Sequence, residues 1–256
     1  MNEISILATI DPAAAFLEVT LTMQDEPATD IQVAPAQAKA GARKIARPGE
    51  RKLQILQTLA TLLEHPKGER ITTAALARKL AVSEAALYRH FASKAQMFEG
   101  LIGFIEETIF GLINQITAGE EDGTKQARGI ILMLLDFAET NRGMTRVLIG
   151  DALVIEDERL TVRMNQMMDR IEASLRQCLK LAVAQAAARR TERNEGAAPA
   201  ESSSHASTRS SSDDFVQERA NLIVAAVIGR WSRFAKSGFR KLPKEYAETQ
   251  AMLLLV

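Results

Sequence analysis

Cysteine is nearly absent from this chain of 256 residues: Cys178 is the single one, so an internal disulfide framework is excluded. The three histidines, His65, His90 and His205, have no spacing suited to a zinc site, and we expect neither metal nor cofactor. No run of about 18 apolar residues occurs. Residues 1–16 lack the basic region of a secretory signal. These absences predict a soluble, cytoplasmic protein with no membrane partner.

Arrangements of residues for catalysis are also missing. The sequence has no Gly-rich phosphate loop, no cluster of histidines with carboxylates, and no local set of nucleophile, base and orienting group. Cys178 lies on the apolar stripe of a long helical pattern, where a buried and unreactive thiol is the better interpretation. We therefore predict no catalytic residue and no enzyme activity.

Charge is distributed unevenly, although the net charge of the whole chain is zero. Residues 1–38 contain six acids and no Lys or Arg. Residues 39–98 contain twelve basic residues and four acids, a net charge of +8. A field of that sign favours a polyanion as partner.

Two segments have the composition of disordered chain. Residues 1–47 lack a helical period and are predicted to be a mostly disordered tail, although 16–23 alternates like a strand that pairs with another chain. Its basic residues at 43, 44 and 47 are interpreted as an arm along the DNA minor groove in preference to a solvated linker. Residues 187–214 contain no large apolar residue, and we predict a solvated linker or loop there.

The rest of the sequence predicts helices, because apolar residues recur at intervals of three and four and no hairpin turn joins two alternating runs. The predicted fold class is all-α. A three-helix DNA-binding domain is expected at 48–93 and a larger helical dimerisation domain at 94–256, whose two long C-terminal helices suit a four-helix interface. The expected helices cover 48–64, about 72–80, 84–90, 93–116, 124–140, 144–149, a long stretch from 157, 215–236 and 243–255.

The informative stretch is 70–98, where a helix, a turn of about three residues and a short helix form a helix-turn-helix. The second helix of such a pair enters the major groove, and the helix N-termini offer N–H groups to phosphates. An ordinary helical hairpin in a core is the alternative, and the positive charge favours DNA. Either Thr72 or Thr73 can cap the first of these helices and Ser83 can cap the second. Ser93 to Gln96 predict a capping box at the start of the next helix.

At AVSEAALYRHFASKAQMF (81–98) the chain resembles the tetracycline-repressor (TetR) family of DNA-binding proteins, whose signature runs from Gly-Val-Ser through Leu-Tyr-x-His-Phe to Ser-Lys. It departs at Ala81, where Gly is usual. A turn with positive φ costs Ala about 1 kcal/mol, so we expect strain or a shifted dihedral angle there.

The resemblance also implies roles for individual residues. A phosphate clamp is implied for Thr72, Thr73, Tyr88, His90 and Lys94, with simple packing as the alternative for Tyr88 and His90. The helix that supplies base contacts begins with Ser83, Glu84, Ala85 and Ala86, which are small apart from the glutamate. Few long side chains therefore reach base edges, and we infer that methyl contacts, Arg89 and DNA shape carry part of the specificity.

A wider resemblance covers roughly residues 50–185 and 215–245, which are similar to nucleoid occlusion factors within this family. It implies a nucleoid-associated homodimer that binds a palindromic site in double-stranded DNA. While bound, such a protein antagonises polymers of the tubulin-like division protein FtsZ and so inhibits septation over the chromosome. The alternatives are a ligand-responsive TetR-type repressor, with a pocket of several hundred cubic ångströms among its helices, and a purely structural helical bundle.

Phe104 and Asn141 match positions of the FtsZ-binding surface in those proteins. Leu112, Asp136 and Thr140 differ, because they stand where Arg, Gly and Arg are usual. The loss of two positive charges and the gain of a carboxylate predict that contacts with an acidic partner are altered or lost.

Overall fold

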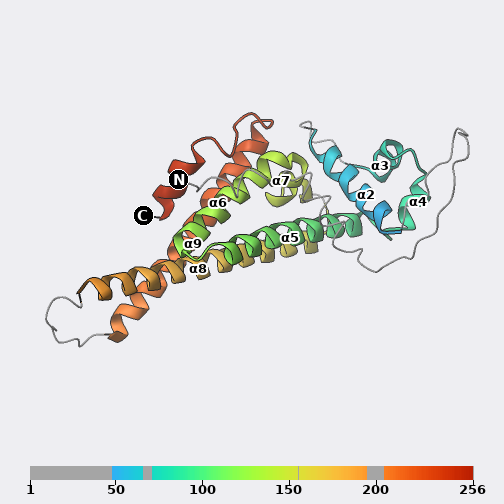
Figure 1. Cartoon of the computed structure of the whole chain (residues 1–256). Coiled ribbons are helices and arrows are strands. Elements are labelled where there is room, and N and C mark those ends of the chain that lie inside the picture. Colours follow the sequence, from blue (N-terminus) through green and yellow to red (C-terminus); the bar gives the residue numbers. More distant parts are fainter. Residues whose placement is uncertain (1–47, 66–70, 155, 195–204, 256) are drawn as a thin grey trace, which may run out of the picture. The chain divides into compact units, whose positions relative to one another are not determined.

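A computed structural model describes residues 48–65, 71–154, 156–194 and 205–255, and within these ranges the chain is all-helical, as predicted (Figure 1). The expected tail at 1–47, with its strand and its arm, lies outside the described residues. No helix in the described part is both long and apolar enough to cross a membrane. The elements are α2 (Pro48–Leu63), α3 (Thr73–Lys79), α4 (Glu84–Tyr88), α5 (Lys94–Gly119), α6 (Gly123–Thr140), α7 (Arg142–Leu148), a 3-10 turn η1 (Asp151–Leu153), α8 (Glu158–Asn194), α9 (His205–Lys236) and α10 (Ala247–Leu255).

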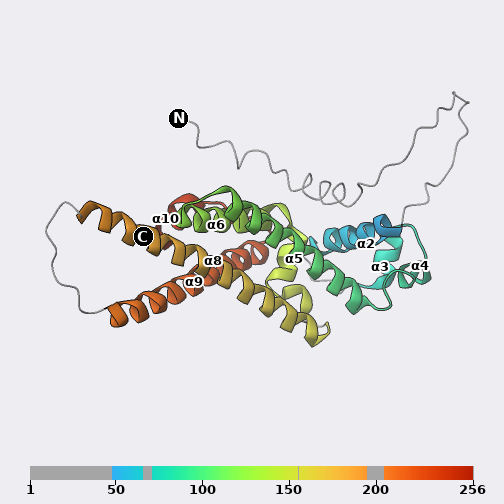
Figure 2. The same cartoon turned by 60° about the horizontal axis from the view of Figure 1, so that its bottom comes forward.

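The helix α6 is the centre of the helical body formed by residues 94–255, because it packs against α5, α8, α9 and α10 (Figures 1 and 2). Its residues Ile130, Ile131 and Leu134 are at most 1% exposed. The indole of Trp231 in α9 is fully buried and donates its N–H to the carbonyl oxygen of Leu134 at 3.1 Å. This bond fixes α9 on α6, since a buried indole N–H needs an acceptor.

Three helices begin at the hydroxyl residues expected to cap them. The Thr72 hydroxyl accepts from the N–H of Ala75 at 3.1 Å, and the Ser83 hydroxyl accepts from that of Ala86 at 3.2 Å. Ser93 accepts from the N–H of Gln96 at 3.1 Å, as the capping box requires. The Gln96 side chain differs from the expectation, because it accepts from the N–H of Ala92 at 2.8 Å instead of that of Ser93.

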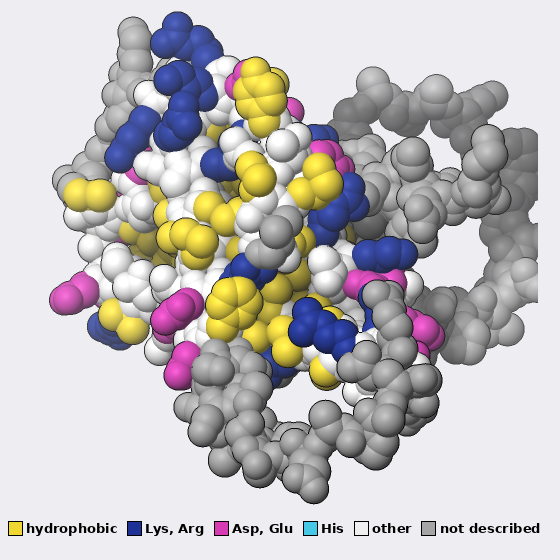
Figure 3. All heavy atoms as spheres, turned by 90° about the vertical axis from the view of Figure 1, so that its left-hand side faces the viewer, with side chains coloured by type: hydrophobic (Ala, Val, Ile, Leu, Met, Phe, Trp, Pro, Cys, Tyr) yellow, Lys and Arg dark blue, Asp and Glu magenta, His cyan; other side chains and the backbone are white. Residues whose placement is uncertain are grey.

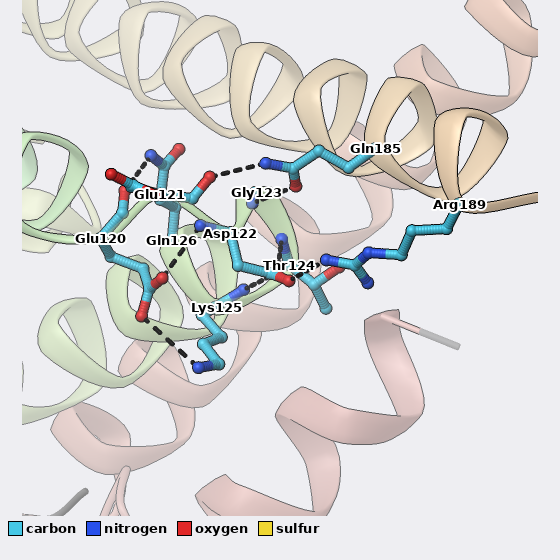
Figure 4. A network of polar contacts seen from close by, with 9 residues as sticks. All are labelled: Glu120, Glu121, Asp122, Gly123, Thr124, Lys125, Gln126, Gln185 and Arg189. Carbon is cyan, nitrogen blue, oxygen red and sulfur yellow. Dashed lines mark hydrogen bonds and ion pairs between the residues drawn. The ribbon is translucent and has the colours of Figure 1, made fainter. Parts of the chain in front are cut away.

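The prediction of a solvated linker at 187–214 is wrong at both ends of that segment. The helix α8 continues through Asn194 and α9 begins at His205, while residues 195–204 lie outside the described ranges. The turn between α5 and α6 holds the far end of α8 (Figure 4): the Gln185 amide donates to the carbonyl of Glu121 at 2.7 Å. These partners are distant in sequence, so the local composition of the segment does not reveal them.

The same turn contains an acidic cap that reaches α8. Asp122 accepts from the N–H groups of Thr124 and Lys125 at 2.9 and 3.1 Å and pairs with the Arg189 guanidinium at 3.1 Å. The backbone N–H of Lys125, followed by Arg189, lowers the pKa of Asp122 below its usual value. A Cβ added at Gly123 would lie 2.5 Å from the backbone nitrogen of Ala182 and closer to the carbonyl of Cys178, so only glycine fits here.

Other helix ends differ from the expected ones by a few residues. The helix α5 extends to Gly119, and α7 begins at Arg142, directly after α6. The last helix begins at Ala247 and not at residue 243. Residues 242–246 form a turn instead, because the Arg230 guanidinium binds their carbonyl groups and Tyr246 takes a φ of 60°.

Candidate nucleic-acid interface

The helices α3 and α4 pack together as a helix-turn-helix. Leu76, Leu87 and Phe91 are 1%, 1% and 8% exposed, so all three belong to the core. Ala81 in the turn has a φ of 52°, in the left-handed region. The turn therefore keeps the geometry that usually selects glycine, and the expected strain at Ala81 is confirmed.

The outward side of this module is open to solvent. Tyr88 is 45% exposed, and His90 and Thr73 are half-buried. The remaining predicted contact residues of α3 and α4 are all exposed: Thr72, Ser83, Glu84, Ala85 and Arg89. Residues 71–98 carry four basic residues against one acid. An accessible surface with these residue types and this sign of charge suits the phosphate backbone of DNA.

Three hydrogen bonds determine which of these groups can still bind a phosphate. The Thr73 hydroxyl donates to the Glu84 carboxylate at 2.5 Å, so its hydrogen serves to fix α3 against α4. The hydroxyls of Thr72 and Ser83 act as acceptors toward their own helices. Because a hydroxyl has one donor and two acceptor sites, Thr72 and Ser83 keep a hydrogen for a phosphate.

Lys94 is not a free cation. Its amino group donates to the carboxylate of Glu156, in the segment between η1 and α8, and also lies 5.6 Å from the centre of the Phe98 ring. The Lys94 and Glu156 side chains are 23% and 11% exposed. Sequence reasoning missed Glu156, because 62 residues separate the two groups and no local pattern joins them. A phosphate that binds Lys94 would therefore displace this carboxylate or share the three N–H donors of the amino group with it.

A short stretch after α6 makes two further contacts with the end of α2. We call α7, η1 and Glu156 the connector. A Cβ added at Gly143 in α7 would lie 2.8 Å from the carbonyl carbon of Ala60 and closer still to its oxygen, so the two backbones touch. The Arg146 guanidinium donates to the carbonyl of His65 at 3.0 Å and pairs with Asp151 at 2.7 Å. The connector therefore contacts α2 and the start of α5 at three places.

The two residues expected to bind FtsZ, Phe104 and Asn141, lie on α5 and at the end of α6. Phe104 is half-buried on α5. The Asn141 amide donates to the carbonyl of Phe137 at 2.9 Å, so this side chain caps the end of α6. Asp136 pairs with Lys244 at 2.6 Å, and this hydrogen bond raises the pKa of Lys244. The carboxylate that was expected to repel an acidic partner is therefore already neutralised by a neighbouring cation.

Cys178 is 2% exposed, and burial raises the pKa of its thiol. The predicted burial of this thiol is confirmed, and the raised pKa disfavours the thiolate, which is the nucleophilic form. Met164 and Met167 on the same helix are 3% and 0% exposed, so they belong to the core.

Known protein families match both the helix-turn-helix region and the helical body of this chain. Residues 62–101 match bacterial regulatory proteins of the tetR family, and residues 122–189 match a tetracyclin repressor-like C-terminal domain. A TetR-like transcriptional regulator from Rhodococcus sp. RHA1 has a TM-score of 0.60 at 16% identity, over 83% of this chain and 96% of that chain. For the TetR family regulator PfmR from Thermus thermophilus the TM-score is 0.57 at 18% identity, over 79% and 97%. These structures share the fold.

Similarity in sequence is higher to proteins described as nucleoid occlusion factor SlmA. The protein from Alteromonas mediterranea is 44% identical over 200 residues, which are 78% of this chain and 91% of that protein. The protein from Vibrio cholerae serotype O1 is 55% identical over 142 residues, 55% of this chain and 70% of that protein. With the exposed helix-turn-helix and the helical body behind it, this similarity shows that the chain belongs to the SlmA family of nucleoid occlusion factors, within the TetR family.

Proposed function

We propose that this chain is a sequence-specific DNA-binding protein of the nucleoid, which binds a palindromic site as a homodimer and, while bound, antagonises FtsZ polymers. The observation that carries the proposal is the open face of α3 and α4, with Thr72, Ser83, Tyr88 and Arg89 accessible together. Helix N-termini and hydroxyls on such a face bind phosphates and fix the register, and α4 then lies in the major groove.

The homodimer forms through α8 and α9 in this proposal. Phe215 and Leu222 on α9 are 49% and 56% exposed, and Gly229 follows at the same spacing of seven residues. Residues at this spacing share one face of a helix, and a glycine lets a second helix approach closely. Leu181 on the neighbouring α8 is 38% exposed. Two copies of this face form a four-helix interface, which sets the two DNA-binding modules about 34–36 Å apart, one turn of DNA.

A ligand-responsive repressor would need space among the helices α5 to α9. The positions of α5 that face α6 and α8 are filled by large apolar side chains instead, because Ile102, Ile105 and Ile109 are all fully buried. This packing supports a protein whose partners bind at its surface.

The experiment that tests the whole function measures FtsZ polymers by sedimentation. We expect the purified chain to reduce the pelleted polymer when its own palindromic DNA is present, and to have little effect with an unrelated duplex of equal length. Sites mapped across the genome should be many and scattered, and absent from the replication terminus. One or a few promoter sites, with no effect on polymers, would support the repressor.

Arg89 is expected to contribute to specificity. Replacing it by Ala should weaken binding to the palindrome by about tenfold and weaken binding to random DNA much less, because a base contact discriminates among sequences. Fluorescence anisotropy at several salt concentrations measures both, and the affinity of the unmodified protein should fall steeply with salt. Arg159→Ala is the matched control, since that side chain is 85% exposed and lies outside the module. Salt-independent binding would contradict the proposal.

The ion pair between Lys94 and Glu156 leads to a second prediction about DNA affinity. Glu156→Gln should raise the affinity for all duplexes by about tenfold, because the phosphate no longer competes with a carboxylate for the Lys94 amino group. Lys94→Ala should lower the affinity, and adding Glu156→Gln to it should change nothing further. If Glu156→Gln weakens binding as strongly as Lys94→Ala, the pair holds the fold and does not compete with DNA; thermal unfolding of each variant separates the two cases.

A further inference from the structure

A groove lies between the end of α9 and the start of α10, on the body and not in the helix-turn-helix. Its volume is about 260 Å³, and its lining residues are Arg230, Arg233, Lys241, Leu242, Glu245, Tyr246 and Gln250. Figure 3 looks onto the side of the molecule that lies at the left of Figure 1, where α10 is. On that side several hydrophobic side chains lie together, and Lys and Arg side chains gather near the top.

The groove has an excess of positive charge. Three cations and one acid line it, and residues 230–244 contain six Lys or Arg and no acid. Among the described residues, neither Arg233 nor Lys241 has an ion-pair partner. Burial, followed by the charge of Arg233, lowers the pKa of Arg230, and the contribution of Arg233 indicates that the two cations lie near enough to repel one another. An anion in the groove would relieve this repulsion.

Arg230 has a structural role that differs from that of the other two cations. Its guanidinium donates to the carbonyl of Pro243 at 2.8 Å and also binds the carbonyl of Glu245 and the side chain of Gln250. It thereby holds the 242–246 turn, in which Tyr246 has a φ of 60°. A left-handed residue other than glycine costs about 1–3 kcal/mol, and such strain concentrates at binding sites. The Tyr246 side chain is 71% exposed and lines the groove together with Lys241 and Leu242.

We propose that this groove binds a small anion, a phosphate or carboxylate group attached to an apolar or aromatic moiety. Arg233 and Lys241 supply the charge, and Leu242 and Tyr246 supply an apolar wall. The volume is close to the lower end of small-molecule sites, about 300–1,000 Å³, which limits the ligand to a single ring or a short chain. The site is separate from the proposed DNA face and does not depend on that function.

The chain offers a direct spectroscopic test, because it contains two tyrosines, Tyr88 in α4 and Tyr246 in the groove. Full-length protein labelled with 3-fluorotyrosine therefore gives two ¹⁹F signals, assigned with Tyr246→Phe. We expect phenyl phosphate and benzoate to shift the Tyr246 signal with saturation, inorganic phosphate to shift it more weakly, and neutral benzamide to leave it unchanged. Adding duplex DNA should move the Tyr88 signal instead, so the two proposals succeed or fail separately.

Two charge reversals complete the experiment. Arg233→Glu and Lys241→Glu should each weaken phenyl phosphate binding by about tenfold, whereas the matched change Lys236→Glu, on exposed α9 outside the groove, should not. Sedimentation of each variant checks that the dimer is unchanged. The proposal is overturned if no charged probe moves the Tyr246 signal, or if the two groove variants bind phenyl phosphate as tightly as Lys236→Glu does. Stronger binding of phosphate than of phenyl phosphate would exclude the apolar wall.

Discussion

Replacing Leu222 by Glu is expected to convert the protein to monomers and to lower its affinity for a palindromic site by a factor of about 10² or more. Leu222 is 56% exposed in the middle of α9, between Phe215 and Gly229 on the same face. Two carboxylates buried against each other in a symmetric interface would repel and lose their hydration. Without the dimer, each DNA-binding module binds one half-site, so the gain from bivalent binding is lost.

Analytical ultracentrifugation and DNA titration measure the two effects. The matched control is Leu253→Glu in α10, where the side chain is 71% exposed and lies outside the proposed interface. That variant should remain dimeric with unchanged DNA affinity. Helicity of both variants should equal that of the original protein. A Leu222→Glu protein that stays dimeric would show that the copies associate through another face.

Gly143→Ala is expected to destabilise the protein by about 3 kcal/mol. The added methyl group would overlap the backbone carbonyl of Ala60. The position of the methyl group is fixed by the backbone of residue 143, so neither group can rotate away. The end of α2 must then move off α7, which also stretches the hydrogen bond from Arg146 to the carbonyl of His65. DNA affinity should fall as well, because the helix-turn-helix is no longer held in one orientation.

Denaturant unfolding followed by circular dichroism measures the loss of stability. Gly111→Ala in α5 is the control, since nothing lies within 4 Å of the added atom. A glycine replaced by alanine within a helix should stabilise the protein by up to about 1 kcal/mol. Equal stability of the two variants would mean that α2 and α7 do not touch in solution.

Sequence patterns predict well where the signal is local. Thr72, Ser83 and Ser93 cap the helices that they were expected to cap, because a hydroxyl within three residues of a free N–H needs no distant partner. The prediction fails where partners are far apart in the chain. Residues after 187 lack large apolar side chains, yet Arg189 is held by Asp122, 67 residues away. Composition alone cannot show such a contact.

At the candidate interface too, local features could be predicted from the sequence and distant contacts could not. Exposure of Tyr88 and Arg89 follows from the helical period, as does burial of Leu87 beside them. The engagement of Lys94 by Glu156 and of Thr73 by Glu84 depends on tertiary structure. The groove beside α10 could not be predicted either, because it requires the turn that Arg230 holds. Family signatures assign phosphate contacts to residue types, whereas side-chain partners decide which of those residues are available.

The connector joins Asn141, at the expected FtsZ-binding surface, to Lys94 at the start of α5. A change of conformation that DNA produces by displacing Glu156 would pass along this one stretch. If DNA and the division polymer both bind as proposed, thermodynamic reciprocity applies: whatever factor DNA adds to the affinity for the polymer, the polymer must add to the affinity for DNA. A growing polymer would thus lengthen the residence of the protein on the chromosome sites nearest to it.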